Sequence, residues 1–310
     1  MKRLSVLLVF VLLLSACGLK KEYKKTVFSM DTEITMKAWG KGAQHALNIA
    51  EQEIIRLNQK YSIKNINETV KNPDEETAYI LNYANEMKEK TEGAFDISIS
   101  PLVRAWGFYS DEFSEKNYKV PTKAELENAQ VLANSGKEVD LGGILKGYCA
   151  DEIVKILKEK GVTSAVLSLG GNVQVIGSNK QGNPWTVGIE NPFDGGVYAS
   201  ISVSDKAVVT SGDYIRYFEK DGKRYHHIID PKTGYPAESG LSSVTIVADK
   251  GIYADSLSTA LFVMGKERAI DYWKNNRDFE MILIDNEGKI FYTEELNLNT
   301  EYEKEIIKGQ

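Results

Sequence analysis

The chain has 310 residues, of which 42% are hydrophobic and 26% are charged, so it can bury the core of one large folded unit. Its 44 acidic residues outnumber its 38 basic ones and no basic stripe is present, which argues against a nucleic-acid-binding protein. No internal repeat or low-complexity tract is evident, which argues against repeat architectures as well.

The first 25 residues have the pattern of an export signal followed by a short tether. Two basic residues precede the apolar run 4–14, which is too short to cross a bilayer as a helix. Leu14-Ser15-Ala16-Cys17 resembles a bacterial lipobox, in which the cysteine is lipidated and becomes the mature N-terminus. We therefore predict a signal peptide over 1–16, a lipidated Cys17 that opens the tether 17–25, and a protein anchored to the extracytoplasmic face of the cell membrane. The alternative is a plain signal peptide cleaved nearby, in which this cysteine has no role.

Apolar spacing and turn residues divide the rest of the chain into helices and strands. Helices are predicted over 43–59, 72–90, 101–106, 144–160 and 254–264, with one more before residue 281. Strands or alternating segments are predicted over 27–39, 95–100, 139–141, 165–169, 173–177, 185–190, 201–203, 207–210, 214–219 and 241–248, with a closing hairpin over 281–292.

Runs of strands interrupted by separate helices favour an α+β fold, with mixed or antiparallel sheets and flanking helices, over a doubly wound sheet. No linker is evident, so one compact unit is expected over 26–300, followed by a C-terminal tail over 301–310. Cys149 lies on the apolar stripe of the predicted helix 144–160, and we interpret it as a core residue rather than a nucleophile.

Two oxygen-bearing side chains lie four residues apart near the start of the predicted helix 254–264. Asp255 and Thr259 would therefore share one helix face. A carboxylate and a hydroxyl are hard oxygen ligands that suit Mg²⁺ with open positions for water and phosphate. The alternative is that Asp255 caps the helix and Thr259 bonds back to its own backbone.

The segment 139–146 resembles a phosphate-cradling loop. Gly142 and Gly143 expose backbone N–H groups at a predicted helix start, and Lys146 adds a positive charge. The spacing is not that of a Walker A loop. The alternative for Lys146 is an ordinary exposed lysine on a helix.

Two of the three histidines, His226 and His227, are adjacent. In a strand their side chains face opposite ways, so at most one of them faces a given site. The sequence leaves open which of the two acts.

These pieces occur together with others in an order that resembles the ApbE family, the FAD:protein FMN transferases, over nearly all of the mature region. The six matching stretches are 28–32; 93–96 with 101–102 and 106–107; 139–147; 169–172; 227–231 with 233–234; and 254–259.

The resemblance implies an enzyme that binds FAD, uses Mg²⁺ and moves FMN onto a Ser or Thr hydroxyl of an acceptor protein, releasing AMP. It implies a metal site formed by the Gly143 carbonyl with Asp255, Ser258 and Thr259, and a catalytic set of His227, Asp255 and Lys146. The residues that it places at the FAD site are Met30, Tyr61, Ala94, Phe95, Asp96, Asp140, Lys146 and Ile229.

Two positions depart from the family pattern. Asp31 replaces the usual Gly after Met30, and Ser258 stands where some members have Asp, so Ser258 is expected to bind metal weakly or through water. His227 is expected either to act as general base or to bond the adenine or ribose end of FAD. Tyr61 is expected either to stack on a ring of FAD or to pack at a helix end.

Two other functions use the same residues. One is an FAD pyrophosphatase, in which water replaces the acceptor hydroxyl and FMN and AMP are released. The other is a surface lipoprotein that binds flavin without catalysis. The partners expected in the first reading are FAD, an extracytoplasmic acceptor protein and, through the lipid, the membrane.

Overall fold

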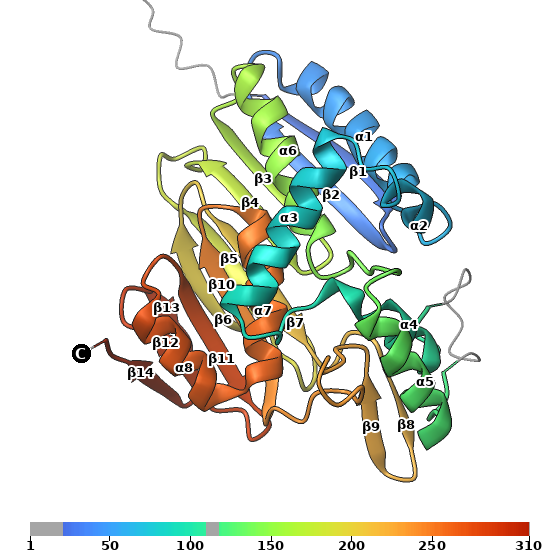
Figure 1. Ribbon diagram of the computed structural model, residues 1–310. Coiled ribbons are helices and arrows are strands. Elements are labelled where there is room, and N and C mark those ends of the chain that lie inside the picture. The colour runs from blue at the N-terminus through green and yellow to red at the C-terminus, as the bar shows by residue number, and fades with distance from the viewer. Residues whose placement is uncertain (1–20, 110–117, 310) are drawn as a thin grey trace, which may run out of the picture.

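The computed structural model describes residues 21–109 and 118–309 (Figure 1). The predicted signal peptide and the lipidated Cys17 lie outside the described residues. Within the two described ranges, no helix combines the length and the apolar character needed to cross a membrane. Helices and strands form one layered unit, which confirms the predicted α+β class.

A nine-stranded sheet lies at the centre, in the order β1-β2-β3-β4-β7-β10-β11-β12-β14. Neighbouring strands are antiparallel, except for the parallel pair β12 and β14. The strands are β1 (Glu22–Ser29), β2 (Thr32–Trp39), β3 (Ser164–Leu169), β4 (Asn172–Gly177), β7 (Ala207–Gly212), β10 (Leu241–Ala248), β11 (Glu280–Asp285), β12 (Ile290–Thr293) and β14 (Lys304–Ile307).

Helices cover one face of this sheet and a smaller sheet covers the other (Figure 1). In β11, Met281 and Leu283 enter the core under the helices, whereas Ile282 and Ile284 enter the core under the smaller sheet. This period of two explains why all four central residues of the strand are apolar. The helices are α1 (Ala43–Lys60), α2 (Ile66–Thr69), α3 (Glu75–Lys90), α6 (Leu145–Glu159), α7 (Gly251–Met264) and α8 (Lys266–Asn275), and the smaller sheet is formed by β13 (Leu298–Asn299), β6 (Val197–Val203) and β5 (Trp185–Glu190).

A third cluster of buried residues lies at one end of the molecule (Figure 1). Leu102 and Trp106 pack there against Leu126 and Ile229, and Trp106 Nε1 donates a hydrogen bond to the Gly234 carbonyl at 2.8 Å. The cluster joins α4 and α5 to a two-stranded hairpin, so it encloses space against the large sheet. Its elements are a 3₁₀ turn η1 (Ile97–Ile99), α4 (Ser100–Ala105), α5 (Lys123–Asn134), β8 (Tyr217–Lys220) and β9 (Lys223–His226).

The strand predicted over 27–39 is wrong, because the chain reverses in its middle. Met30 and Asp31 form the turn between β1 and β2, with φ of 51° and 59°. Two successive left-handed residues make a turn whose twist matches that of the flanking strands. Asp31 therefore keeps the conformation for which Gly is favoured, since Asp tolerates this region better than most residues.

Other predicted boundaries also shift. The segments 95–100 and 139–141 are not strands, and the helix predicted from 72 begins at Glu75, where Asp74 accepts a hydrogen bond from the Thr77 N–H. Strand β8 begins at Tyr217 rather than 214. At the two ends, β1 takes residues 22–25 from the predicted tether and β14 takes residues 304–307 from the predicted tail, because both strands pair within the large sheet. Cys149 is fully buried, as predicted, and burial raises the pKa of its thiol.

Candidate active site

A cavity of about 1020 Å³ lies in the described part of the chain, and its volume is at the upper end of the range for small-molecule sites. It lies between the β1–β2 turn, the segments before and at the start of α6, the end of β7 and the third buried cluster. All eight residues predicted for the FAD site line it: Met30, Tyr61, Ala94, Phe95, Asp96, Asp140, Lys146 and Ile229.

Asp255 lies inside this cavity, in the second turn of α7, and does not cap the helix. The carboxylate is buried, with 4% of the residue exposed, and its Oδ2 accepts a hydrogen bond from the Gly147 N–H at 2.8 Å. Burial raises the pKa of Asp255, and the positive charge of Lys146 counteracts this. The carboxylate is thus held in a position where a cation would stabilise it.

The cap of α7 comes instead from Asp151 of α6, a residue distant in sequence. Its Oδ1 accepts the Gly251 N–H at 2.7 Å, and its Oδ2 accepts the Ile252 N–H at 3.0 Å. The alternative interpretation, in which Asp255 caps its own helix, is therefore wrong.

Thr259 lies one turn after Asp255 and lines the same cavity. A Cβ on Gly143 would lie 3.3 Å from Thr259 Oγ1, so the backbone at this glycine lies close to the Thr259 hydroxyl. Because a carboxylate, a hydroxyl and a nearby backbone segment are hard oxygen donors, the residues fit Mg²⁺. Among the described residues there is no group of three or more His, Cys, Asp or Glu side chains suited to a metal, so phosphate and water oxygens would complete the shell.

Ser258 is the exception among the predicted metal ligands. It is fully buried, does not line the cavity, and its Oγ lies 2.8 Å from Ser211 Oγ and 2.9 Å from the Asp255 carbonyl oxygen. Its hydroxyl therefore ties α7 to the end of β7 rather than facing the cavity.

The glycine loop before α6 is held by hydrogen bonds within the protein. Asp140 Oδ1 accepts the Gly142 N–H at 2.6 Å, so this N–H is not exposed for an anion as the sequence predicted. In the first turn of α6, the Leu145 N–H donates to the Leu141 carbonyl and the Gly147 N–H donates to Asp255 Oδ2. Lys146 lines the cavity and donates to the Gly142 carbonyl at 3.4 Å. A lysine beside a helix N-terminus still favours a bound phosphate.

The structure distinguishes the two histidines. His227 lines the cavity, and its Nδ1 lies 3.2 Å from the Arg216 carbonyl oxygen. Because a carbonyl only accepts, Nδ1 carries the proton and Nε2 is left as a proton acceptor. His226 does not line the cavity; it is buried and bonds the Ala237 carbonyl at 3.1 Å.

Burial, together with the positive charge of Arg216, lowers the pKa of His227 to about 3. The imidazole is therefore neutral near pH 7 and can accept a proton there.

Tyr61 follows the end of α1 and lines the cavity, and its hydroxyl lies 3.1 Å from Thr77 Oγ1 of α3. The packing role expected at the helix end is confirmed, and stacking on FAD stays a prediction. Asp96 is similarly tied down, because Oδ1 accepts the Ser98 N–H at 2.9 Å and Oδ2 lies 2.7 Å from Lys88 Nζ.

Several cavity residues were not predicted. Asn172 follows a predicted Gly-Gly turn, lines the cavity, and acts on the Asp255 carboxylate by lowering its pKa, which burial raises. Tyr109 and Arg216 also line the cavity, and no sequence pattern marks either of them.

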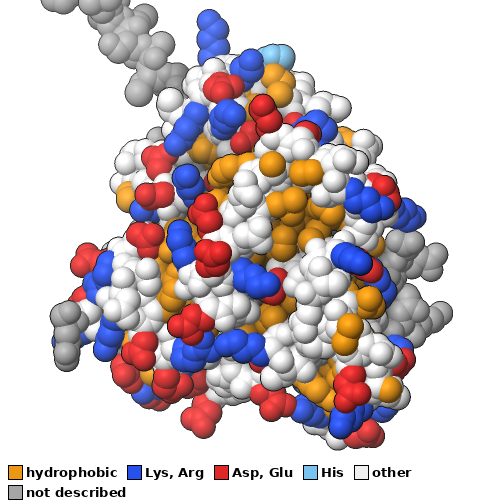
Figure 2. All heavy atoms as spheres, in the orientation of Figure 1, with side chains coloured by type: hydrophobic (Ala, Val, Ile, Leu, Met, Phe, Trp, Pro, Cys, Tyr) orange, Lys and Arg blue, Asp and Glu red, His pale blue; other side chains and the backbone are white. Residues whose placement is uncertain are grey.

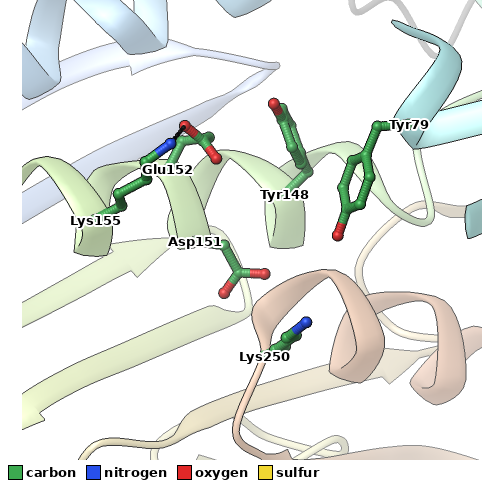
Figure 3. Close-up of a pocket in the computed structure, with 6 residues that line it drawn as sticks. All are labelled: Tyr79, Tyr148, Asp151, Glu152, Lys155 and Lys250. Carbon is green, nitrogen blue, oxygen red and sulfur yellow. Dashed lines mark ion pairs between the residues drawn. The ribbon is translucent and has the colours of Figure 1, made fainter. Parts of the chain in front are cut away.

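A second cavity, of about 430 Å³, lies on a face where hydrophobic side chains, tyrosines included, gather over α3 (Figure 2). Tyr79 of α3 and Tyr148 of α6 stand side by side there, and Asp151 points toward the start of α7 (Figure 3). Glu152 and Lys155 pair with each other at 3.7 Å. Its carboxylates are thus used in structural contacts, so the main cavity remains the candidate active site.

Known proteins are similar to this chain in sequence. The ApbE family model matches residues 30–283. The chain is 34% identical over 264 residues to an FAD:protein FMN transferase of Haemophilus influenzae, which covers 77% of this chain and 73% of that protein. A similar enzyme of Salmonella typhimurium is 34% identical over 240 residues, which covers 71% of this chain and 67% of that one.

Solved structures agree with the sequence relatives. The ApbE protein of Thermotoga maritima superposes with a TM-score of 0.80 and 32% identity, over 88% of this chain and 97% of that one. The flavin transferase ApbE of Vibrio cholerae gives a TM-score of 0.77 and 26% identity, over 88% and 97%. With its six motifs gathered around one cavity and its whole fold shared, the chain belongs to the ApbE family.

Proposed function

We propose that the protein transfers FMN from FAD to a Ser or Thr hydroxyl of an acceptor protein, releases AMP and requires Mg²⁺. One observation carries the proposal: a cavity of about 1020 Å³ brings a buried carboxylate, a lysine and a neutral imidazole together at a glycine loop. The names of the relatives, FAD:protein FMN transferases, support the same reaction.

The residues divide the chemistry between them. The hydroxyl oxygen of the acceptor forms a bond to the FMN phosphorus, and the bond from that phosphorus to the bridging oxygen breaks, so AMP leaves. His227 Nε2 takes the proton of the hydroxyl, and the Arg216 carbonyl holds its ring by the opposite nitrogen. Lys146 balances the negative charge that gathers on the phosphate oxygens.

Asp255, Thr259 and the Gly143 carbonyl would hold Mg²⁺, which neutralises diphosphate charge when it is bound. The Gly147 N–H orients the Asp255 carboxylate by a hydrogen bond of 2.8 Å. Ser258 would support the site from behind through its bond to Ser211.

We also propose that the reaction takes place outside the cytoplasm, on a protein anchored by lipid at Cys17. The support is the sequence alone: a short apolar run followed by Leu14-Ser15-Ala16-Cys17. Metabolic labelling with a radioactive fatty acid checks the anchor, since Cys17→Ser should abolish the label and release the protein from membranes.

Incubation of residues 18–310 with FAD, MgCl₂ and a candidate extracytoplasmic acceptor tests the transferase reaction. Mass spectrometry should show one FMN added to the acceptor, together with an equal amount of AMP. An acceptor in which the target hydroxyl residue is replaced by Ala is the control. Release of AMP at full rate without any adduct would instead establish the pyrophosphatase, and binding of FAD without any AMP would establish a flavin-binding protein.

A further inference from the structure

A cation at the rim of the main cavity has no role in the chemistry above. Of the described residues that line the cavity, Lys64, Lys146 and Arg216 carry positive charge. Arg216 lies directly before β8, and its carbonyl accepts both the His227 N–H at 3.0 Å and the His227 imidazole at 3.2 Å. The backbone of Arg216 is thus fixed beside His227, and its side chain starts from a defined place in the wall.

The guanidinium of Arg216 pairs across the rim with Asp31 of the β1–β2 turn. Arg216 Nη2 lies 3.7 Å from Asp31 Oδ2, and the two side chains are 31% and 55% exposed. Such long, exposed ion pairs contribute little free energy. A ligand with two phosphates can therefore compete with Asp31 for this guanidinium, because charge-assisted hydrogen bonds to phosphate are stronger.

Arg216 shares its cavity with the other phosphate-binding group, because Lys146 also lines it. Besides burial, the positive charges of Arg216 and Lys146 both lower the pKa of His227, in agreement with this common lining. His226 acts on the same ring but does not line the cavity, since it is buried and bonded to the Ala237 carbonyl. The imidazole that is expected to take the proton thus lines the same cavity as two cations.

We infer that Arg216 binds the diphosphate of FAD through its guanidinium, and that Asp31 competes with the diphosphate for this group. The inference rests on the proposed function in taking FAD as the ligand. Asp31 would make the cavity selective for polyanions, because a ligand must displace its carboxylate in order to bind the Arg216 guanidinium. Riboflavin, which has no phosphate, cannot displace it.

The two side chains can be tested separately. Arg216→Gln removes the guanidinium but keeps the carbonyl that holds His227. Asp31→Asn removes the charge but keeps a residue that tolerates the φ of 59°. Arg224→Gln is a matched control, because Arg224 is 39% exposed, pairs with Asp213 and Glu219, and does not line the cavity.

Equilibrium binding of FAD and of riboflavin, followed by flavin fluorescence at fixed salt and Mg²⁺, gives opposite expectations for the two variants. Arg216→Gln should bind FAD about tenfold more weakly or worse, with riboflavin binding unchanged. Asp31→Asn should bind FAD roughly two- to fivefold more tightly. Arg224→Gln should behave like the wild type with both ligands.

The double variant separates competition from simple repulsion between Asp31 and FAD. If Asp31 acts through Arg216, the gain from Asp31→Asn disappears in the Arg216→Gln background. Persistence of the gain, or wild-type affinity of Arg216→Gln for FAD, overturns the inference while the proposed function stands. Failure of the wild type to bind FAD at all would refute the proposed function itself, and the inference with it.

Discussion

Gly147 offers the sharpest test of how the site is built, because it is the point where α6 and α7 touch. A Cβ at this position would collide with the Gly251 carbonyl group and would lie 2.7 Å from Asp255 Cβ. Gly251 is equally constrained, since a Cβ there would lie 2.6 Å from the Gly147 carbonyl oxygen. Backbone atoms cannot move aside as a side chain can, so Gly147→Ala must push the two helices apart.

We expect Gly147→Ala to lower the free energy of unfolding by about 3 kcal/mol, the upper part of the range for overpacked cores. The melting temperature should fall by about 5 °C. Turnover should also fall, even at temperatures where the variant is folded, because the Gly147 N–H that orients Asp255 would move with α6.

Circular dichroism melting of residues 18–310 without metal measures the first effect, and Mg²⁺-dependent release of AMP measures the second. Gly188→Ala serves as the stability control, since its Cβ would meet nothing closer than the Val197 methyl group at 3.4 Å. An unchanged melting temperature in Gly147→Ala would show that the helices are not in backbone contact and would refute this reasoning.

Four further perturbations address the other groups. Asp255→Asn should abolish Mg²⁺-dependent turnover and should stabilise the metal-free protein. Burial raises the pKa of Asp255, so its ionised form lowers the stability of the fold once the pH exceeds the folded pKa. A variant that melts at a lower temperature than the wild type near pH 7 would contradict this expectation. His227→Gln should lower kcat by about 10²- to 10⁴-fold with little change in FAD affinity, and a normal kcat would remove the base assignment. Burial lowers the pKa of His227 to about 3 and that of His226 to about 4, so the unfolded chain binds more protons than the folded one between pH 4 and 6.5. The free energy of unfolding should therefore fall on acidification through this window. Urea titrations at pH 7 and pH 5 measure the change. Asp151→Ala should cost about 1–2 kcal/mol by leaving the Gly251 and Ile252 N–H groups without a cap, whereas Asp151→Asn should lose less, as urea unfolding would show.

Local pattern was enough to predict the long elements, because their periodicity is strong. The helix that became α1 and the strands that became β5 and β10 lie within one residue of the predicted bounds. The turn at Met30 and Asp31 was missed because no Gly or Pro marks it and Met30 is not a turn residue. Pairing of β1 with β2 imposes the left-handed conformation there.

In the candidate site too, part was predicted from local sequence and part was not. The helical spacing of Asp255 and Thr259 correctly placed both on one face, and both line the cavity. The same spacing could not show that Ser258 turns toward Ser211, nor that Asp151 caps α7 from about 100 residues away. Those contacts depend on how α6, α7 and β7 pack, and packing partners distant in sequence leave no periodic signal.

The early start of β1 limits how high the protein can stand above a bilayer. With Cys17 lipidated, as we propose, only residues 18–21 separate the lipid from Glu22, and β1 then leads directly to Met30 at the cavity. A fully extended chain from Cys17 to Met30 reaches about 40 Å. Any partner must therefore bring its hydroxyl to within about 40 Å of the lipid headgroups, which favours acceptors that are themselves embedded in, or held close to, the same membrane.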